Sequence, residues 1–240
     1  MAIGGQSMTM STAGGNVAVG YGTLKTNITG SNLVAIGAEA LCKNNAYDNI
    51  AIGYVASQCN IIGVSNIAIG TCALRLNETG SSNVAIGRNS LSDNETGSYN
   101  TVVGDAAIGG SGGSVVRSTA IGYYALYNQE YGQNTAVGYL AQQKNTTGYY
   151  NTSIGDHALE DNQTGHNNTA VGWCALHENE ASNNTAVGMY AALCNTTGTY
   201  NVAMGINALR SNTTGSSNVA IGLHTLYLSL IHISEPTRLL

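Results

Sequence analysis

The chain has 240 residues, of which 31 are glycine and one is proline, and only 9% are charged. Its net charge of −5 is scattered, so no basic stripe of the kind that follows nucleic acid phosphates is present. No apolar run approaches the roughly 18 residues needed to span a membrane, and the N-terminal MAIGGQSMTM lacks the charged and apolar regions of a signal peptide. We therefore expect no nucleic acid partner and no membrane-spanning segment in this chain, and any export signal would lie outside it.

A four-residue word recurs along the chain, from MAIG at residues 1–4 and VAVG at 17–20 to VAIG at 219–222. A fixed period of this kind indicates a repeat architecture. The words are 16 to 18 residues apart and all end in glycine. These glycines are Gly4, Gly20, Gly37, Gly53, Gly70, Gly87, Gly104, Gly122, Gly138, Gly155, Gly172, Gly188, Gly205 and Gly222.

The rest of each unit is also regular. Ala and Leu follow the glycine after a two-residue gap, as in Ala175-Leu176, and a turn word such as NTTG at 145–148 comes next. An asparagine stands directly before most of the glycine-ending words, and the place is taken otherwise only by Leu33 and Ser118. These asparagines are Asn16, Asn49, Asn66, Asn83, Asn100, Asn134, Asn151, Asn168, Asn184, Asn201 and Asn218.

A unit of about 17 residues is too short for two packed helices but long enough for two short strands and two turns. The word N-[TV]-A-[VI]-G alternates, which predicts a strand with its β-branched residues on one face and Asn and Ala on the other. The glycine supplies a positive φ where the chain turns. We therefore predict an all-β fold, a parallel β-solenoid of about 14 coils, with Val, Ile and Leu inside and the Ala–Asn face available to neighbouring chains.

These words resemble the head repeats of YadA-like trimeric autotransporter adhesins over Met1 to about Tyr227. The longer unit, with its A-L and NTTG words, also resembles repeats of phage tail fibres. The resemblance implies a left-handed parallel β-roll, a parallel homotrimer that projects from a cell surface or a virion, and contact with host receptors, matrix proteins or glycans. It implies no active site. The coiled-coil stalk, membrane anchor and chaperone domain of such proteins have no counterpart in this sequence.

The C-terminal segment departs from the pattern. Leu228 to Arg238, LSLIHISEPTR, has no counterpart upstream and resembles the translation of a sequencing-library adapter, and Pro236 within it is the only proline of the chain. We predict one solenoid domain over residues 1–227, a fragment of a longer fibre open at both ends, followed by a non-native tail at 228–240. The alternative is a genuine capping strand, which solenoids often need.

Several residues invite a catalytic or ligand-binding interpretation that we do not favour. Ser153, Asp156 and His157 are close in sequence, but Asp156 and His157 occupy variable positions after a repeat glycine, and catalysis needs a positioned nucleophile, base and orienting group. The glycine-rich residues 109–114 lack the Lys and Ser/Thr of a phosphate-binding loop, so we interpret them as an inserted loop. We predict no catalytic residue, no cofactor and no metal.

The remaining candidates have structural explanations. The five cysteines form no CxxC pair and are interpreted as small apolar fillers, with a bridge between layers as the alternative: Cys42, Cys59, Cys72, Cys174 and Cys194. Glycosylation-type sequons are explained by turn chemistry: Asn27, Asn77, Asn94, Asn145, Asn162, Asn195 and Asn212. Repeated tyrosines are interpreted as ladder packing, with glycan stacking as the alternative: Tyr21, Tyr54, Tyr99, Tyr123, Tyr139, Tyr150 and Tyr200.

The function we expect is that of a non-enzymatic adhesin or fibre segment, whose many weak contacts add up to avidity. A phage tail-fibre shaft or spacer is the alternative. A remote alternative is an ice-binding solenoid, suggested by a threonine column: Thr101, Thr119, Thr135, Thr152, Thr169 and Thr185. A glycan-cleaving spike would need paired carboxylates beside a sugar groove. The acids available, Asp93 with Glu95 and Glu160 with Asp161, are expected to be solvated corner residues.

Overall fold

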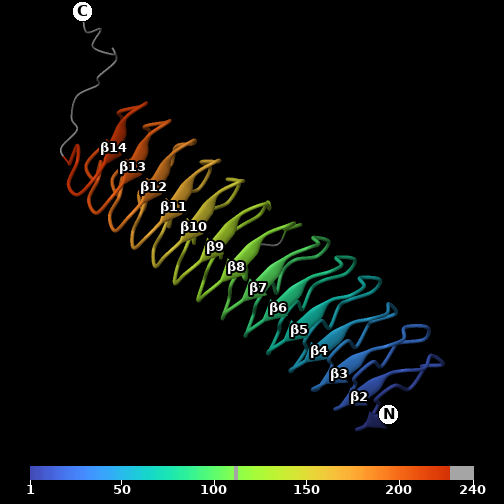
Figure 1. Cartoon of the computed structure of the whole chain (residues 1–240). Coiled ribbons are helices and arrows are strands. Elements are labelled where there is room, and N and C mark those ends of the chain that lie inside the picture. The colour runs from blue at the N-terminus through green and yellow to red at the C-terminus, as the bar shows by residue number, and fades with distance from the viewer. Residues whose placement is uncertain (111–112, 228–240) are drawn as a thin grey trace, which may run out of the picture. The chain divides into compact units, whose positions relative to one another are not determined.

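The computed structural model describes residues 1–110 and 113–227, and none of these residues lies in a helix. They form fourteen short strands, one in each repeat, distributed over two compact units. The first unit, Met1–Asn134, contains β1 (Ala2–Ile3), β2 (Val17–Val19), β3 (Val34–Ile36), β4 (Ile50–Ile52), β5 (Ile67–Ile69), β6 (Val84–Ile86), β7 (Thr101–Val103) and β8 (Thr119–Ile121) (Figure 1). The second unit, from Thr135 onward, contains β9 (Thr135–Val137), β10 (Thr152–Ile154), β11 (Thr169–Val171), β12 (Thr185–Val187), β13 (Val202–Met204) and β14 (Val219–Ile221).

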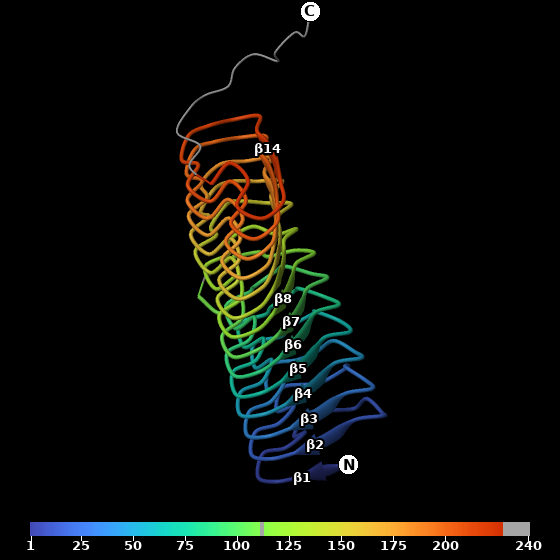
Figure 2. The same cartoon turned by 60° about the vertical axis from the view of Figure 1, so that its left-hand side comes forward.

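Within each unit every strand pairs in parallel with the next strand along the chain. The register places equivalent residues side by side, for example Thr152 beside Thr169 and Ile154 beside Val171. The labelled strands of a unit accordingly follow one another in sequence order, which a second view also shows (Figures 1 and 2). The prediction of an all-β parallel solenoid with one coil per repeat is confirmed. The left-handed sense that the resemblance implies stays a prediction.

The glycine at the end of each strand is required by two independent constraints. At Gly172 the backbone has φ +130°, a conformation that residues with a side chain rarely adopt. A Cβ added there would also lie 2.7 Å from the carbonyl carbon and oxygen of Gly188, one coil further on. The predicted turn glycine is therefore confirmed, and close stacking of the corners is a second reason for it.

The rest of each coil consists of turns, so the second strand predicted for each unit is absent from the described residues. Left-handed residues recur in these turns, and in the coil after Gly155 they are His157 (φ 56°), Leu159 (φ 55°) and Asn167 (φ 57°). Each left-handed residue other than glycine costs about 1–2 kcal/mol of conformational energy. The coil is held in this shape by hydrogen bonds to its neighbours, for instance from the Leu159 N–H to the Ala175 carbonyl at 3.0 Å.

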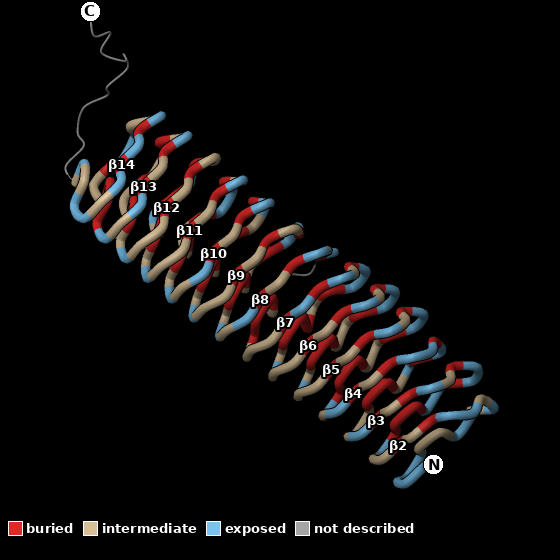
Figure 3. The backbone as a smooth tube through the Cα atoms, viewed as in Figure 1, coloured by how far each residue is buried: buried red, intermediate tan, exposed pale blue. Residues whose placement is uncertain are grey.

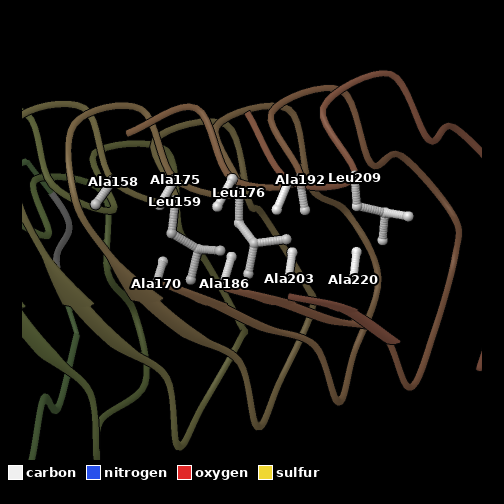
Figure 4. Packing of buried hydrophobic residues seen from close by; sticks show 12 residues of the cluster. Ala158, Leu159, Ala170, Ala175, Leu176, Ala186, Ala192, Ala203, Leu209 and Ala220 are labelled. Atoms are coloured by element: carbon white, nitrogen blue, oxygen red, sulfur yellow. The ribbon is translucent and has the colours of Figure 1, made fainter. Parts of the chain in front are cut away.

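The core of most coils is made of alanine and leucine, and Val102 is the one β-branched strand residue among the described buried side chains. The middle strand residue is buried and its two neighbours are half-buried or exposed, as in Thr169-Ala170-Val171. Figure 3 shows this alternation of buried residues with half-buried or exposed residues along the strands. Figure 4 shows why it arises, because the leucine side chains Leu159, Leu176 and Leu209 extend from the turns towards the strand alanines.

The predicted assignment of strand faces is therefore wrong. Ala170 and Ala186 are fully buried inside their coils, whereas Val171 and Ile154 face outward. In most coils a leucine from the opposite turn already occupies the interior, so the middle strand position takes a small residue, usually alanine. Within residues 1–110 and 113–227 the alanines of β2 to β14 are buried and offer no small-residue surface for chain association, and the outward face of these strands carries Val, Ile, Thr and Met.

Two ladders of buried asparagine run through the coils. In the first, the turn-word asparagines are linked by side-chain amides, as where Asn162 Nδ2 donates to Asn145 Oδ1 at 3.2 Å and to the Gly165 carbonyl at 3.0 Å. In the second, an asparagine directly before a strand accepts a backbone N–H of the next coil, as where Asn168 Oδ1 accepts from Asn184 N at 2.9 Å. The asparagines thus lie inside the coils, where their amides pair with backbone groups that would otherwise be unsatisfied.

Three sequence predictions concern residues or boundaries that the described structure does not test. The tail at 228–240 lies outside the described residues, as do residues 111–112 of the glycine-rich segment. The single domain over residues 1–227 also stays a prediction, because the chain divides into two units at Asn134. No apolar helix of membrane-spanning length occurs in the part of the chain that is described.

Candidate functional site

The positions that follow each repeat glycine form columns along the side of the coils. The parallel register stacks one residue from each coil at every position, so each column is a ladder of chemically different side chains. The first position after the glycine is exposed and largely apolar in the second unit, and the second and fifth positions are mostly half-buried. The first column of that unit is Tyr139, Asp156, Trp173, Met189, Ile206 and Leu223.

One group of side chains in the second unit brings three potential metal ligands together. His157 and Glu160 belong to one coil, and His177 stands at the position of Glu160 on the next coil, 17 residues later. The ligand atoms of the three residues all lie within 4.8 Å of one another. No other such group of histidine, cysteine or acidic residues occurs in the described residues, 1–110 and 113–227. We call this group the His–Glu–His cluster.

Glu160 is the centre of this cluster. Its Oε2 contacts His157 Nδ1 and lies 3.2 Å from His177 Nε2. Only 12% of the Glu160 side chain is exposed, against 30% for His157 and 26% for His177. A carboxylate with this little contact to water needs polar partners, and the two imidazole rings supply them. The expectation that Glu160 is a solvated corner residue is wrong.

Asp156 and Tyr139 complete the surroundings of His157. Asp156 Oδ1 lies 3.2 Å from His157 Nε2, so both ring nitrogens of this histidine face a carboxylate oxygen. The Tyr139 ring packs edge-on against the His157 ring, with centroids 5.5 Å apart. The orientation of the His157 ring is therefore determined from three sides.

Ser153 is not part of this group. It takes the place of the buried strand alanine, and its Oγ hydrogen-bonds inside the coil to Gln142 Oε1 at 3.1 Å and to the Thr135 carbonyl at 3.3 Å. His157, in contrast, is directed to Asp156 and Glu160. The structure brings Asp156 and His157 together but places Ser153 elsewhere, so these three residues do not form a nucleophile–base arrangement.

Two of the other acidic residues considered for glycan cleavage, Asp161 and Asp93, are in ion pairs. Asp161 lies 2.6 Å from Lys144 Nζ, and the hydrogen bond between them raises the pKa of Lys144. Asp93 lies 3.5 Å from Arg75 and accepts a hydrogen bond from Ser92 Oγ at 3.2 Å. Each of these two carboxylates thus faces a cation, whereas glycoside hydrolysis requires two carboxyl groups that flank the scissile bond.

The cysteines lie on the coil corners and not in the core. All five are free and half-buried. Burial, followed by the nearby charges of Asp156 and Glu160, raises the pKa of Cys174. The fully buried positions are occupied mainly by alanine and leucine, and the interpretation of the half-buried cysteines as small apolar fillers stays a prediction.

The sequon asparagines and the repeated tyrosines differ in their exposure to solvent. The seven sequon asparagines are all buried, since their amides form the inner ladder, and the turn explanation of these words is confirmed. The seven tyrosines are all exposed. Ring contacts between adjacent coils do occur, such as Tyr139 against His157, but the tyrosines leave roughly half of their surface to solvent.

Sequence reasoning missed the His–Glu–His cluster because it considered each coil separately. The signal that reveals it is the period itself, since Glu160 and His177 stand one 17-residue repeat apart and His157 is three residues before Glu160. Comparison with family models, with curated proteins and with solved structures gave no match. The chemical role of the chain therefore rests on its own geometry.

Proposed function

We propose that this chain is a non-enzymatic segment of a trimeric surface fibre, exposed on a bacterial cell or carried by a virion, that attaches to host cells, matrix proteins or glycans. The observation that carries the proposal is the outward face of the strands. In the second unit this face exposes Ile154, Met204 and Ile221, beside the apolar first column that includes Trp173 and Leu223. Contiguous apolar surface of this kind marks an interaction site on a folded protein.

Three copies of the same chain are well suited to cover this face. Each copy carries the same columns at the same spacing, so chains aligned in parallel would match coil for coil. The outward β-branched residues, and not the buried alanines, would form the seam between chains. The first column and the exposed tyrosines at the coil edges would then be left for contacts with the host.

Charge placed on the strand face tests the trimer. We expect the unmutated chain to sediment as a trimer and the triple variant Ile154→Lys, Val171→Lys, Val187→Lys to sediment as a monomer with an unchanged β circular dichroism spectrum. The matched control places three lysines at exposed turn-word positions of three coils, Thr147→Lys, Thr164→Lys and Thr197→Lys. The control should remain trimeric. A soluble monomer of the unmutated chain would contradict the trimer.

Attachment is tested separately, on the assembled protein. The purified chain is applied to host cells, to immobilised matrix proteins and to a glycan array, and binding is compared with that of the variant Tyr139→Ala, Trp173→Ala. We expect the aromatic variant to lose most of the binding while the Thr147→Lys variant retains it, because exposed aromatic rings supply contact area at low entropic cost. A trimer that binds none of these surfaces would be a spacer within the fibre.

The threonine column favours one other function, that of an ice-binding solenoid. Thr135, Thr152, Thr169 and Thr185 pair in register in the second unit, on the outward strand face. The column two residues along the strand consists of Val137, Ile154, Val171 and Val187 and not of a second set of threonines. Thermal hysteresis of a solution of the chain would establish this function, and its absence would exclude it.

A further inference from the structure

Three side chains of the second unit direct ligand atoms to one small region on the surface of two adjacent coils. They are Nδ1 of His157, Nε2 of His177 and a carboxylate oxygen of Glu160, the His–Glu–His cluster. We propose that this cluster binds one divalent zinc ion. The inference does not depend on the proposed fibre function, since it follows from these residues alone.

The donor set suits zinc better than calcium or magnesium. Zn²⁺ is held in proteins by imidazole nitrogen, carboxylate oxygen and thiolate sulfur, whereas Ca²⁺ and Mg²⁺ require a shell of oxygen ligands. The cluster offers two imidazole nitrogens and one carboxylate, and its other neighbour, Cys174, lies outside the group of ligand atoms. Three protein ligands leave the fourth tetrahedral position to a water molecule or an external ligand.

The spacing of the ligand atoms is compatible with an ion. Zinc ligands lie about 2.0–2.2 Å from the metal, which separates two tetrahedral ligands by about 3.4 Å. His177 Nε2 and Glu160 Oε2 are already 3.2 Å apart, and no pair in the cluster exceeds 4.8 Å. The carboxylate of Glu160, which now contacts the His157 ring, has only to draw back from that ring for the ion to take its place between them.

Asp156 acts as the partner that orients a metal-binding histidine. When a histidine binds a metal through one ring nitrogen, the other nitrogen almost always donates its hydrogen to a carboxylate, a carbonyl or water. His157 has this arrangement, because Nδ1 faces the cluster and Nε2 lies 3.2 Å from Asp156 Oδ1. With an ion bound, the ring proton would lie on Nε2, facing Asp156, and the Nδ1 lone pair would face the ion. Asp156 is therefore a positioning residue and not a ligand.

The coil backbone holds the ligands in place. The N–H of Asp161, next to Glu160, donates to the His177 carbonyl at 3.0 Å, and the N–H of Cys174 donates to the Asp156 carbonyl at 3.0 Å. The two coils are thus joined by hydrogen bonds on both sides of the cluster. A bound ion would add a third link between them, and a site held by rigid elements loses little entropy on binding.

Other coils of the second unit show which residues can replace each ligand without loss of the fold. Asn207 stands at the position of His157 with the same left-handed backbone, φ 56° at both, and Gln143 stands at the position of Glu160. The variants are therefore His157→Asn, Glu160→Gln and His177→Gln. His166 of the same unit, which stacks on Tyr149 with ring centroids 4.9 Å apart, provides the control His166→Gln.

Zinc binding is measured by titration calorimetry on the full chain, without a polyhistidine tag and after treatment with a chelator. We expect one Zn²⁺ per chain at micromolar affinity or tighter, no binding of Mg²⁺ or Ca²⁺, and a tetrahedral absorption spectrum with Co²⁺. Each ligand variant should weaken zinc binding by at least about 10-fold, Asp156→Asn should weaken it by about 10–100-fold, and His166→Gln should leave it unchanged.

Thermal unfolding gives a second readout that does not depend on the calorimetric signal. Saturating Zn²⁺ should raise the melting temperature of the unmutated chain and of His166→Gln, because an ion that binds only the folded state stabilises it. It should not raise that of His157→Asn or Glu160→Gln, whose circular dichroism spectra establish that they are folded. Affinity weaker than millimolar, or equal affinity in the folded ligand variants, would show that the cluster is only a hydrogen-bonded network and would overturn the proposal.

Discussion

Asn195 Nδ2 donates a hydrogen bond of 2.7 Å to Oδ1 of Asn179, the asparagine at the same position of the preceding coil. Asn179 Oδ1 also accepts from Asn184 Nδ2 at 3.1 Å, while its own Nδ2 donates to the Ala181 carbonyl at 2.7 Å. One buried amide therefore joins the turn of its own coil to the asparagine ladder of the next. Asn179 thus accepts a hydrogen bond from the asparagine of the next coil and donates one to Asn162 Oδ1 of the preceding coil.

Replacement of Asn179 by alanine should lower the free energy of unfolding by about 2–4 kcal/mol, because the buried amides of Asn184 and Asn195 each lose one acceptor and the Ala181 carbonyl loses one of its two donors. Urea denaturation of the full chain measures the change. Gln163→Ala, at an exposed position of the same unit, is the control and should alter stability by less than about 0.5 kcal/mol. Equal effects of the two substitutions would mean that the ladder contributes nothing.

Replacement of Gly172 by alanine should cost about 3 kcal/mol or more, since the added Cβ combines a strained backbone with a contact of 2.7 Å to the Gly188 carbonyl. The comparison is Gly14→Ala, where an added Cβ would meet no atom within 4 Å and φ is not in the left-handed range. Thermal melting of both variants distinguishes them. A stable Gly172→Ala variant would show that the corners can move apart.

Gln142 and Ser153 form a polar pair at positions where most other coils have leucine and alanine. Gln142 Oε1 accepts from Ser153 Oγ, but Gln142 Nε2 has no partner among the described residues. The double variant Gln142→Leu, Ser153→Ala should gain about 1–2 kcal/mol of stability, whereas Ser153→Ala alone should lose about 1 kcal/mol. A double-mutant cycle in urea measures both, and a destabilised double variant would refute the explanation.

Replacement of Ala186 by arginine should unfold its coil and not merely separate chains. Ala186 is fully buried, so the guanidinium would have no room and no partner, and we expect a loss of more than about 3 kcal/mol. Loss of the β circular dichroism signal at the temperature where the unmutated chain is folded would support this. Val187→Arg, at the outward neighbour, should keep the spectrum.

Cys194 should react slowly with iodoacetamide. Burial, and then the charge of Glu178, raises its pKa, so less thiolate is present at a given pH than in a free thiol. The alkylation rate of Cys194 should therefore begin to rise at a higher pH than the alkylation rate of glutathione. Mass spectrometry of the alkylated chain measures the rate, and unfolding in urea should restore the ordinary value. A rate equal to that of glutathione in the folded chain would contradict the prediction.

The fold could be predicted from the sequence, because few architectures are compatible with a period of about 17 residues and a glycine after each alternating word. The inward face of the strand could not be predicted in this way. Alternation places Ala170 and Val171 on opposite faces but does not show which face is inward. That choice depends on Leu176, which reaches across the coil and leaves space for a methyl group only. To predict the contact between Glu160 and His177, residues one repeat apart must be placed side by side on adjacent coils. The repeat period contains this register, but the residues of one coil alone do not show it.

The in-register columns also bear on how such a gene can change. Every coil of the second unit meets its neighbours through the same backbone bonds, glycine corners and asparagine amides. An in-frame recombination between two copies of the repeat would therefore remove or add a whole layer and restore an equivalent junction. Heritable variation in the number of layers is then compatible with folding, whereas an insertion of a few residues within a layer displaces every column beyond it.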